Sequence, residues 1–126
     1  MKKLINISGK EVGFRASALT PRLYRAWIGR DMIVDMKHLS DSHKKIRDAQ
    51  ENGTEEEKEA AAFSVVDLTI FENVAYVMAK HYDASIPDNP NDWLDEMPMF
   101  SIYEIMPQLL ELWQMNTATT AKPKKK

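Results

Sequence analysis

The chain has 126 residues, a formal net charge of −2 at pH 7 and no cysteine. This length is typical of one domain with one core, and the absence of cysteine excludes disulfides and thiolate metal sites. No apolar run approaches the roughly 20 residues of a membrane span, and the N-terminal residues lack the apolar stretch of a signal peptide, so we expect a cytoplasmic protein without membrane contact.

The N-terminal region is predicted to form a β-hairpin. Residues 4 to 7 and 11 to 15 are short runs on either side of a Ser-Gly-Lys turn, in which Gly9 can take a positive φ angle. The second run offers Val12 and Phe14 to a core. Two strands alone are marginally stable, so the hairpin must pack on helices or pair with another subunit.

The first helix is predicted to begin with Thr20 as its N-cap and Pro21 at the first helical position. Apolar side chains at helical spacing continue to about residue 39, and Gly29 should bend or break the helix. The side opposite the apolar stripe carries three arginines: Arg22, Arg25 and Arg30.

Residues 40 to 57 are polar and strongly charged, which is typical of a linker or an exposed helix-loop and favours mobility. Asn52 and Gly53 indicate a turn within this segment. Thr54, followed by three glutamates, indicates that a helix starts there.

The helix on which the rest should pack spans about residues 58 to 82. Its apolar side chains form two neighbouring stripes, wider than the roughly 100° of apolar arc that one packing partner requires. Asp67 falls between the stripes, where a buried carboxylate would need a partner such as an arginine or a tyrosine hydroxyl. The first stripe is Phe63, Val66, Ile70, Val74 and Val77, and the second is Leu68, Phe71, Ala75, Met78 and Tyr82.

The C-terminal part is predicted to hold a short helix over residues 90 to 96 and a longer one that begins after Ser101. Pro107 should kink or restart the second helix. Residues 117 to 126 are Lys-rich and lack large apolar side chains, so we expect a disordered basic tail after a single helical domain over residues 1 to 116.

Charge is segregated along the chain. Residues 1 to 47 carry a net +7, residues 48 to 121 a net −13, and the C-terminal lysines add +4. The two regions could fold against each other and neutralise locally, or a basic face of one copy could meet an acidic face of the next. The second interpretation makes Arg22, Arg25 and Arg30 a self-association face. A solvated face and nucleic-acid contacts are the alternatives for these three, although a duplex binder usually has a denser basic stripe.

No arrangement of residues indicates catalysis. The histidines, His38, His43 and His81, lack the spacing of three or four that a metal site on one helix requires. Phosphate-binding glycine loops and nucleophile elbows are absent from the sequence. We therefore expect no cofactor, no metal and no enzymatic activity.

Eight methionines and three tryptophans are enough for both a core and an adaptable binding surface. Five large apolar residues fall in one segment interrupted by proline, which makes them the candidate partner-binding surface: Trp93, Leu94, Met97, Met99 and Phe100.

Three segments resemble the tail assembly chaperones of long-tailed phages and prophages of Gram-positive bacteria. They are FRASALTPRLYRAWIGRDMIVDM (residues 14 to 36), FENVAYVMAKHYD (residues 71 to 83) and FSIYEIMPQLLELWQMNTATTAKPKKK (residues 100 to 126). They follow the order found in that family and span most of the chain. Residues 39 to 59 carry none of the resemblance.

The resemblance implies a small, mainly helical protein encoded between the major tail protein and the tape measure protein. Such a protein binds the tape measure protein, keeps it soluble, helps to recruit tail-tube subunits and is not retained in the mature virion. The resemblance also implies a partner that is a longer form of the same protein, made by ribosomal frameshifting. The segregated charge, separately from the resemblance, makes a homo-oligomer a further expectation. Two alternatives remain: a small nucleic-acid-binding regulator that uses the Arg-bearing first helix, and a structural tail component.

Overall fold

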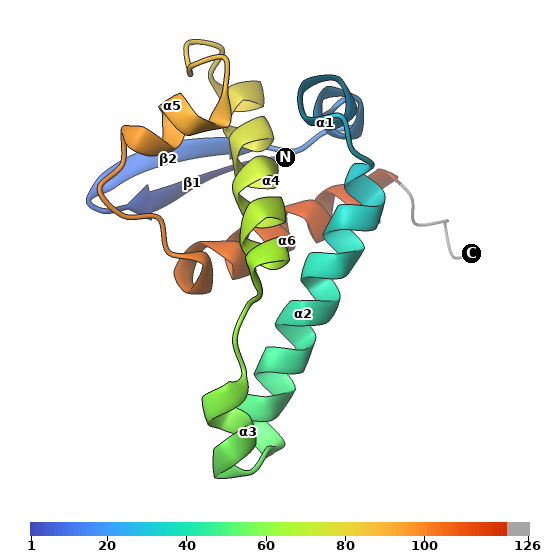
Figure 1. Ribbon diagram of the computed structural model, residues 1–126. Coiled ribbons are helices and arrows are strands. Elements are labelled where there is room, and N and C mark those ends of the chain that lie inside the picture. The colour runs from blue at the N-terminus through green and yellow to red at the C-terminus, as the bar shows by residue number, and fades with distance from the viewer. Residues whose placement is uncertain (121–126) are drawn as a thin grey trace.

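The computed structural model describes the backbone of residues 1 to 120 and the side chains of residues 1 to 114. Within residues 1 to 120, a two-stranded sheet precedes six helices (Figure 1). The elements are β1 (Lys2–Ile7), β2 (Lys10–Arg15), α1 (Thr20–Ile28), α2 (Met32–Asn52), α3 (Glu55–Ala60), α4 (Val65–Tyr82), α5 (Pro90–Asp95) and α6 (Ile102–Thr120). The predicted fold class, mainly helical with an N-terminal hairpin, is confirmed.

The hairpin is antiparallel, with Ile5 opposite Val12. Its turn contains Ser8 and Gly9, both with positive φ. Alternate side chains, including Val12 and Phe14, are buried, because β2 packs against α4 and β1 against α6. The hairpin is therefore supported by helices of its own chain.

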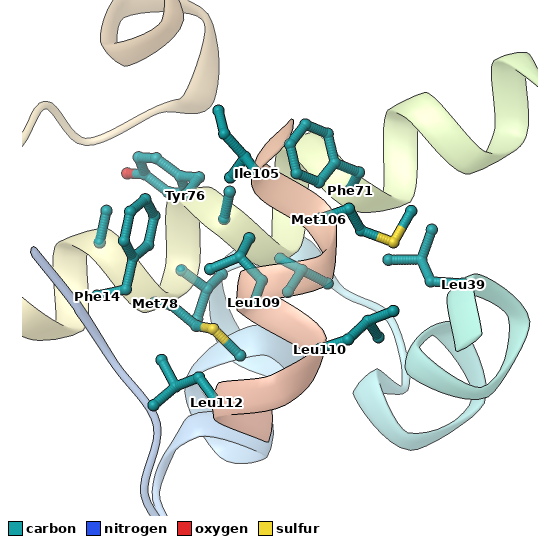
Figure 2. Packing of buried hydrophobic residues seen from close by; sticks show 14 of the residues in the cluster. Phe14, Leu39, Phe71, Tyr76, Met78, Ile105, Met106, Leu109, Leu110 and Leu112 are labelled. Carbon is teal, nitrogen blue, oxygen red and sulfur yellow. The ribbon is translucent and has the colours of Figure 1, made fainter. Parts of the chain in front are cut away.

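Helix α4 is the centre of the molecule, as predicted, and contacts β2, α1, α2, α5 and α6. Figure 2 shows the buried side chains of α4 and α6 packed together, with Phe14 from β2 and Leu39 from α2 at the edges of the cluster. The central helix begins later than predicted, because α3 ends at Ala60 and residues 61 to 64 are not helical. Ser64 caps α4: its hydroxyl accepts the Asp67 N–H, and the Asp67 carboxylate accepts the Ser64 N–H.

The predicted break at Gly29 separates α1 from α2, and Gly29 has a φ of 83°. The prediction that Thr20 is the N-cap of α1 is wrong. Leu19 occupies the cap position with helical φ and ψ and no side-chain cap. The Thr20 hydroxyl instead accepts the Ser17 N–H at 2.8 Å, which fixes the turn before the helix.

Residues 40 to 57, predicted as a linker or an exposed helix-loop, form the second half of α2, a turn and most of α3. The turn at Gly53 and the helix start at Thr54 are confirmed; Thr54 and Glu57 make a reciprocal capping box. Neither α3 nor the part of α2 beyond Leu39 contains a buried residue. We call residues 40 to 60 the arm, because they project from the body of the molecule (Figure 1).

Helix α5 is capped by Asn89, whose side chain accepts the Asp92 N–H. Helix α6 begins at Ile102, as predicted, and contains Pro107 within one continuous helix. It runs to Thr120, so the first residues of the predicted tail are helical, and residues 121 to 126 lie outside the described part of the chain. Within the part that is described, none of the helices combines the length and apolar character needed to cross a membrane.

Candidate interaction surface

Most of the predicted partner-binding surface belongs to the core. Trp93 is only 3% exposed, and its ring centroid lies 6.0 Å from that of Tyr76. Phe100 stacks on the buried Phe71 with ring centroids 4.9 Å apart. Leu94 and Met97 are half-buried against this core. Met99 is 69% exposed. The five residues therefore do not form a continuous exposed surface.

Exposed apolar side chains gather instead at the N-terminal end of α4. Val65, Val66 and Leu68 are 78%, 56% and 37% exposed. The preceding Phe63 contacts Tyr103 at the start of α6: their ring centroids are 5.1 Å apart, and the Phe63 N–H donates to the Tyr103 hydroxyl at 3.3 Å. We call Val65, Val66, Leu68 and the exposed Tyr103 the α4 apolar surface.

The sequence pattern predicted that Val66 and Leu68 would be buried, because both lie on the apolar stripes of α4. The second half of α4 is enclosed, and every residue from Val74 to Ala79 is buried. Its first turn lacks this enclosure because the arm turns away from the body there (Figure 1). Helical periodicity shows the width of an apolar face but not where along the helix its neighbours end.

A groove of about 560 Å³ lies within the arm, between the second half of α2 and the end of α3, and reaches α4 only at Asp67. Ile46 and Ala49 of α2 line one side, and residues 60 to 62 line the other. The side-chain amide of Gln50 connects α2 to α3 by donating a hydrogen bond to the Lys58 carbonyl at 3.0 Å. The rim of the groove is charged, with Lys45, Asp48, Glu57 and Asp67.

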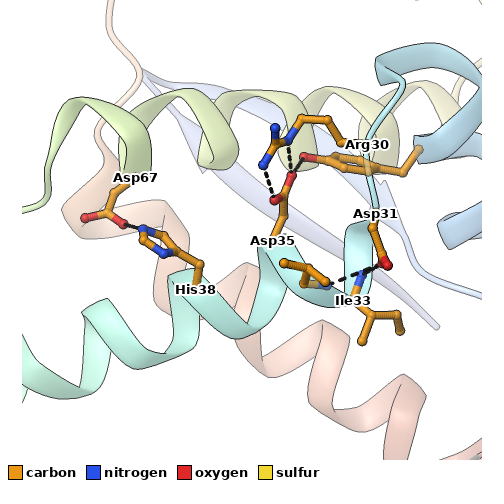
Figure 3. A network of polar contacts seen from close by, with 8 residues as sticks. Arg30, Asp31, Ile33, Asp35, His38 and Asp67 are labelled. Atoms are coloured by element: carbon orange, nitrogen blue, oxygen red, sulfur yellow. Dashed lines mark hydrogen bonds and ion pairs between the residues drawn. The ribbon is translucent and has the colours of Figure 1, made fainter.

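The three predicted self-association arginines differ in their surroundings. Arg30 makes a two-pronged ion pair with Asp35, with both N–O distances 2.7 Å (Figure 3). Arg22 and Arg25 are exposed, and among the residues with described side chains they have no ion-pair partner. Arg30 therefore serves the fold, and only the other two are available as a basic surface.

The ion pair of Asp35 closes the corner between α1 and α2. This carboxylate is 1% exposed and also accepts the hydroxyl of the buried Tyr24 at 2.7 Å. The hydrogen bond from Arg30 outweighs burial and lowers the pKa of Asp35, whereas burial, reinforced by the contact with Asp35, raises the pKa of Tyr24 far above its ordinary value.

Asp67 is buried as predicted, but its partners are neither arginine nor tyrosine. His38 Nε2 lies 2.8 Å from its Oδ1 (Figure 3). The Ser42 hydroxyl donates to the same oxygen at 2.8 Å, and the Ser64 N–H donates to Oδ2. Burial raises the pKa of this carboxyl, but the hydrogen bonds from Ser64 and Ser42 outweigh it, so the pKa is lowered. Asp67 is a satisfied structural carboxylate that joins α2 to α4.

Ser17 and His81 form another polar contact between distant segments, with the hydroxyl oxygen 2.9 Å from Nε2. Burial, and next the positive charges of Arg15 and the N-terminus, lower the pKa of His81. In the described part of the chain, no carboxylate hydrogen-bonds to this histidine. The contact with Ser17 connects the segment before α1 to α4. Over the same residues, no three His, Asp or Glu side chains are grouped to hold a metal ion.

Comparisons with protein families, with curated proteins and with solved structures found no match.

Proposed function

We propose that this chain is a tail assembly chaperone that binds a tape measure protein, keeps it soluble and helps to recruit subunits of the major tail protein. In this proposal it acts in the host cytoplasm, is joined by a longer frameshifted form of itself, and leaves before the virion is complete. The resemblance of the three sequence segments supports the identity of the client.

The α4 apolar surface is the observation that carries the proposal. Three of the four residues from Val65 to Leu68 are large apolar side chains left in solvent. Isolated exposed apolar residues are ordinary, but contiguous ones mark sites of protein contact. Such a surface suits an aggregation-prone client that must be kept soluble before assembly.

Co-expression with the neighbouring tape measure protein tests the proposal directly. The wild-type chain should move the client from the pellet to the soluble fraction, and the Val65→Glu/Val66→Glu variant should not. Acidic residues in the first turn of a helix are favoured by its dipole, so α4 should still form. Ala84→Glu/Asn91→Glu adds the same charge at exposed positions beyond the other end of α4 and should solubilise the client like the wild type. An insoluble client with the wild-type chain, or equal activity of the Val65/Val66 variant, would contradict the proposal.

A nucleic-acid-binding regulator is the second candidate. Arg22 and Arg25 favour it, because they are exposed and have no ion-pair partner among the side chains that the structure describes. Binding that uses phosphate contacts weakens steeply as salt rises. A titration with duplex DNA and with single-stranded RNA across salt concentrations tests this, with Arg22→Gln/Arg25→Gln as the variant that should lose binding. The absence of binding at low salt would exclude this role.

A further inference from the structure

We propose that copies of this chain associate head to tail, with the exposed arginine face of α1 in one copy docking on the acidic face of α3 in the next. The inference concerns self-assembly and does not depend on which client the chain binds.

The α1 face carries basic side chains, and its own segment of the sequence has no acidic residue to neutralise them. Residues 15 to 30 contain four arginines and no acidic residue. Arg22 and Arg25 project from the exposed side of α1 and lack an ion-pair partner among the described side chains. Leu19, which is 46% exposed and one helical turn before Arg22, adds apolar surface beside them.

The α3 face has the opposite charge. Residues 48 to 59 contain six acidic residues and one lysine. Glu56 and Glu59 are exposed and have no ion-pair partner among the described side chains. Glu55 makes an ion pair with Lys58, with Oε2 and Nζ 3.8 Å apart. The groove within the arm is lined in part by Glu57 and Ala60 of this helix.

The two faces cannot meet within one copy. Helix α2 connects α1 to α3, and its 21 residues separate them by about 30 Å at 1.5 Å per residue. Figure 1 shows α1 and α3 at opposite ends of the molecule. Among the described residues, Lys3–Glu111 is the only lysine or arginine ion pair between the basic first 47 residues and the acidic remainder. Folding therefore leaves most of the segregated charge uncompensated, which disfavours local neutralisation.

When the α1 face of one copy docks on the α3 face of another, the resulting dimer still has one free α3 face and one free α1 face. Such a heterologous contact continues into a ring or an open filament. Ion pairs at an exposed interface are individually weak and are screened by salt, so Leu19 beside the arginines and the groove beside α3 must add apolar contact. Assembly should accordingly be salt-sensitive and larger than a dimer.

Light scattering coupled to gel filtration, after nuclease treatment, tests the proposal on the full chain. Two variants reverse one face each: Arg22→Glu/Arg25→Glu and Glu56→Lys/Glu59→Lys. The second retains Thr54 and Glu57, so the capping box of α3 is kept. Lys2→Glu/Lys10→Glu and Asp95→Lys/Glu96→Lys are the controls, since they change the net charge by the same −4 and +4 at other exposed sites. Circular dichroism checks that each variant is folded.

At about 0.05 M salt the wild type should be at least three times the 14.5 kDa monomer mass, and at about 0.5 M it should shift towards monomer because the screening length is shorter. Each single-face variant should be monomeric at low salt, and both controls should match the wild type. Mixing the two single-face variants, or combining all four substitutions in one chain, restores opposite charges and should restore assembly. A monomeric wild type at low salt, equal loss in the controls, failure of the four-substitution chain to assemble, or assemblies that dissolve on nuclease treatment would each overturn the proposal.

Discussion

Tyr82, the last residue of α4, covers Gly13 of β2 so closely that a Cβ atom on Gly13 would lie 2.2 Å from Tyr82 Cε1. The φ angle of Gly13 is not positive, so its backbone conformation does not require glycine. The requirement is steric, because the Tyr82 ring occupies the space that a side chain at position 13 would fill.

Gly13→Ala should therefore destabilise the protein by about 1–3 kcal/mol, the usual cost of overpacking, measured by urea unfolding. The added methyl group would collide with the Tyr82 ring, which is partly exposed and can move. The loss of stability should therefore depend on whether this ring is present. In the Tyr82→Ala background the same substitution should cost much less, giving a coupling of at least about 0.5 kcal/mol in a double-mutant cycle. Strictly additive effects would show that the ring does not confine Gly13.

Local patterns predicted much of the fold because the signals lie in adjacent residues. The hairpin turn at Gly9, the break at Gly29 and the helix start at Thr54 each depend on the conformational preference of one residue and its neighbours. The start of α4 was missed because Ser64 and Asp67 form a capping box inside an otherwise helical apolar pattern.

The interaction surface was harder to predict because exposure depends on tertiary neighbours. Trp93 and Phe100 follow a proline-interrupted pattern that is compatible with an exposed segment, yet they contact Tyr76 and Phe71 of α4. Val66 matches a buried stripe, yet it lies where the enclosure of α4 ends. Residue type shows that these side chains are apolar, and only the fold decides which of them remain in solvent.

Asp35→Asn should destabilise the protein by about 2–3 kcal/mol, because it removes the charge of a buried carboxylate and leaves its hydrogen-bond donors, Arg30 and Tyr24, poorly satisfied. Asp41→Asn on the same helix is the matched control. Its exposed pair with Lys37 at 3.1 Å should contribute no more than about 0.5 kcal/mol. Urea unfolding of both variants at neutral pH measures the difference, and similar losses would mean that burial of the Asp35 carboxylate has little energetic consequence.

Stability should fall as the pH decreases from about 7.5 to about 5.5 because of His43 and His81. Burial is the main cause that lowers the pKa of both histidines below the ordinary value of 6.5. The unfolded chain then binds more protons in this window, so the stability present above the unfolded pKa is lost as pH falls towards the lowered folded pKa.

The variant His43→Gln/His81→Gln should show a smaller difference in unfolding free energy between these two pH values. Titration of the two imidazoles by NMR should give midpoints below 6.5 in the folded protein. Midpoints above that value would reverse the sign of the expected pH dependence.

The arm should open independently of the body, because α3 has no buried residue. Thr54→Ala removes the hydroxyl that accepts the Glu57 N–H at 3.1 Å and should cost the arm about 1 kcal/mol. Hydrogen exchange of the α3 amides should then accelerate about 5-fold, while the midpoint of global unfolding stays the same. Ser64→Ala is the control, because it removes the equivalent cap of the central helix and should lower global stability by about 1 kcal/mol. An equal global loss in both variants would show that the arm and the body unfold as one unit.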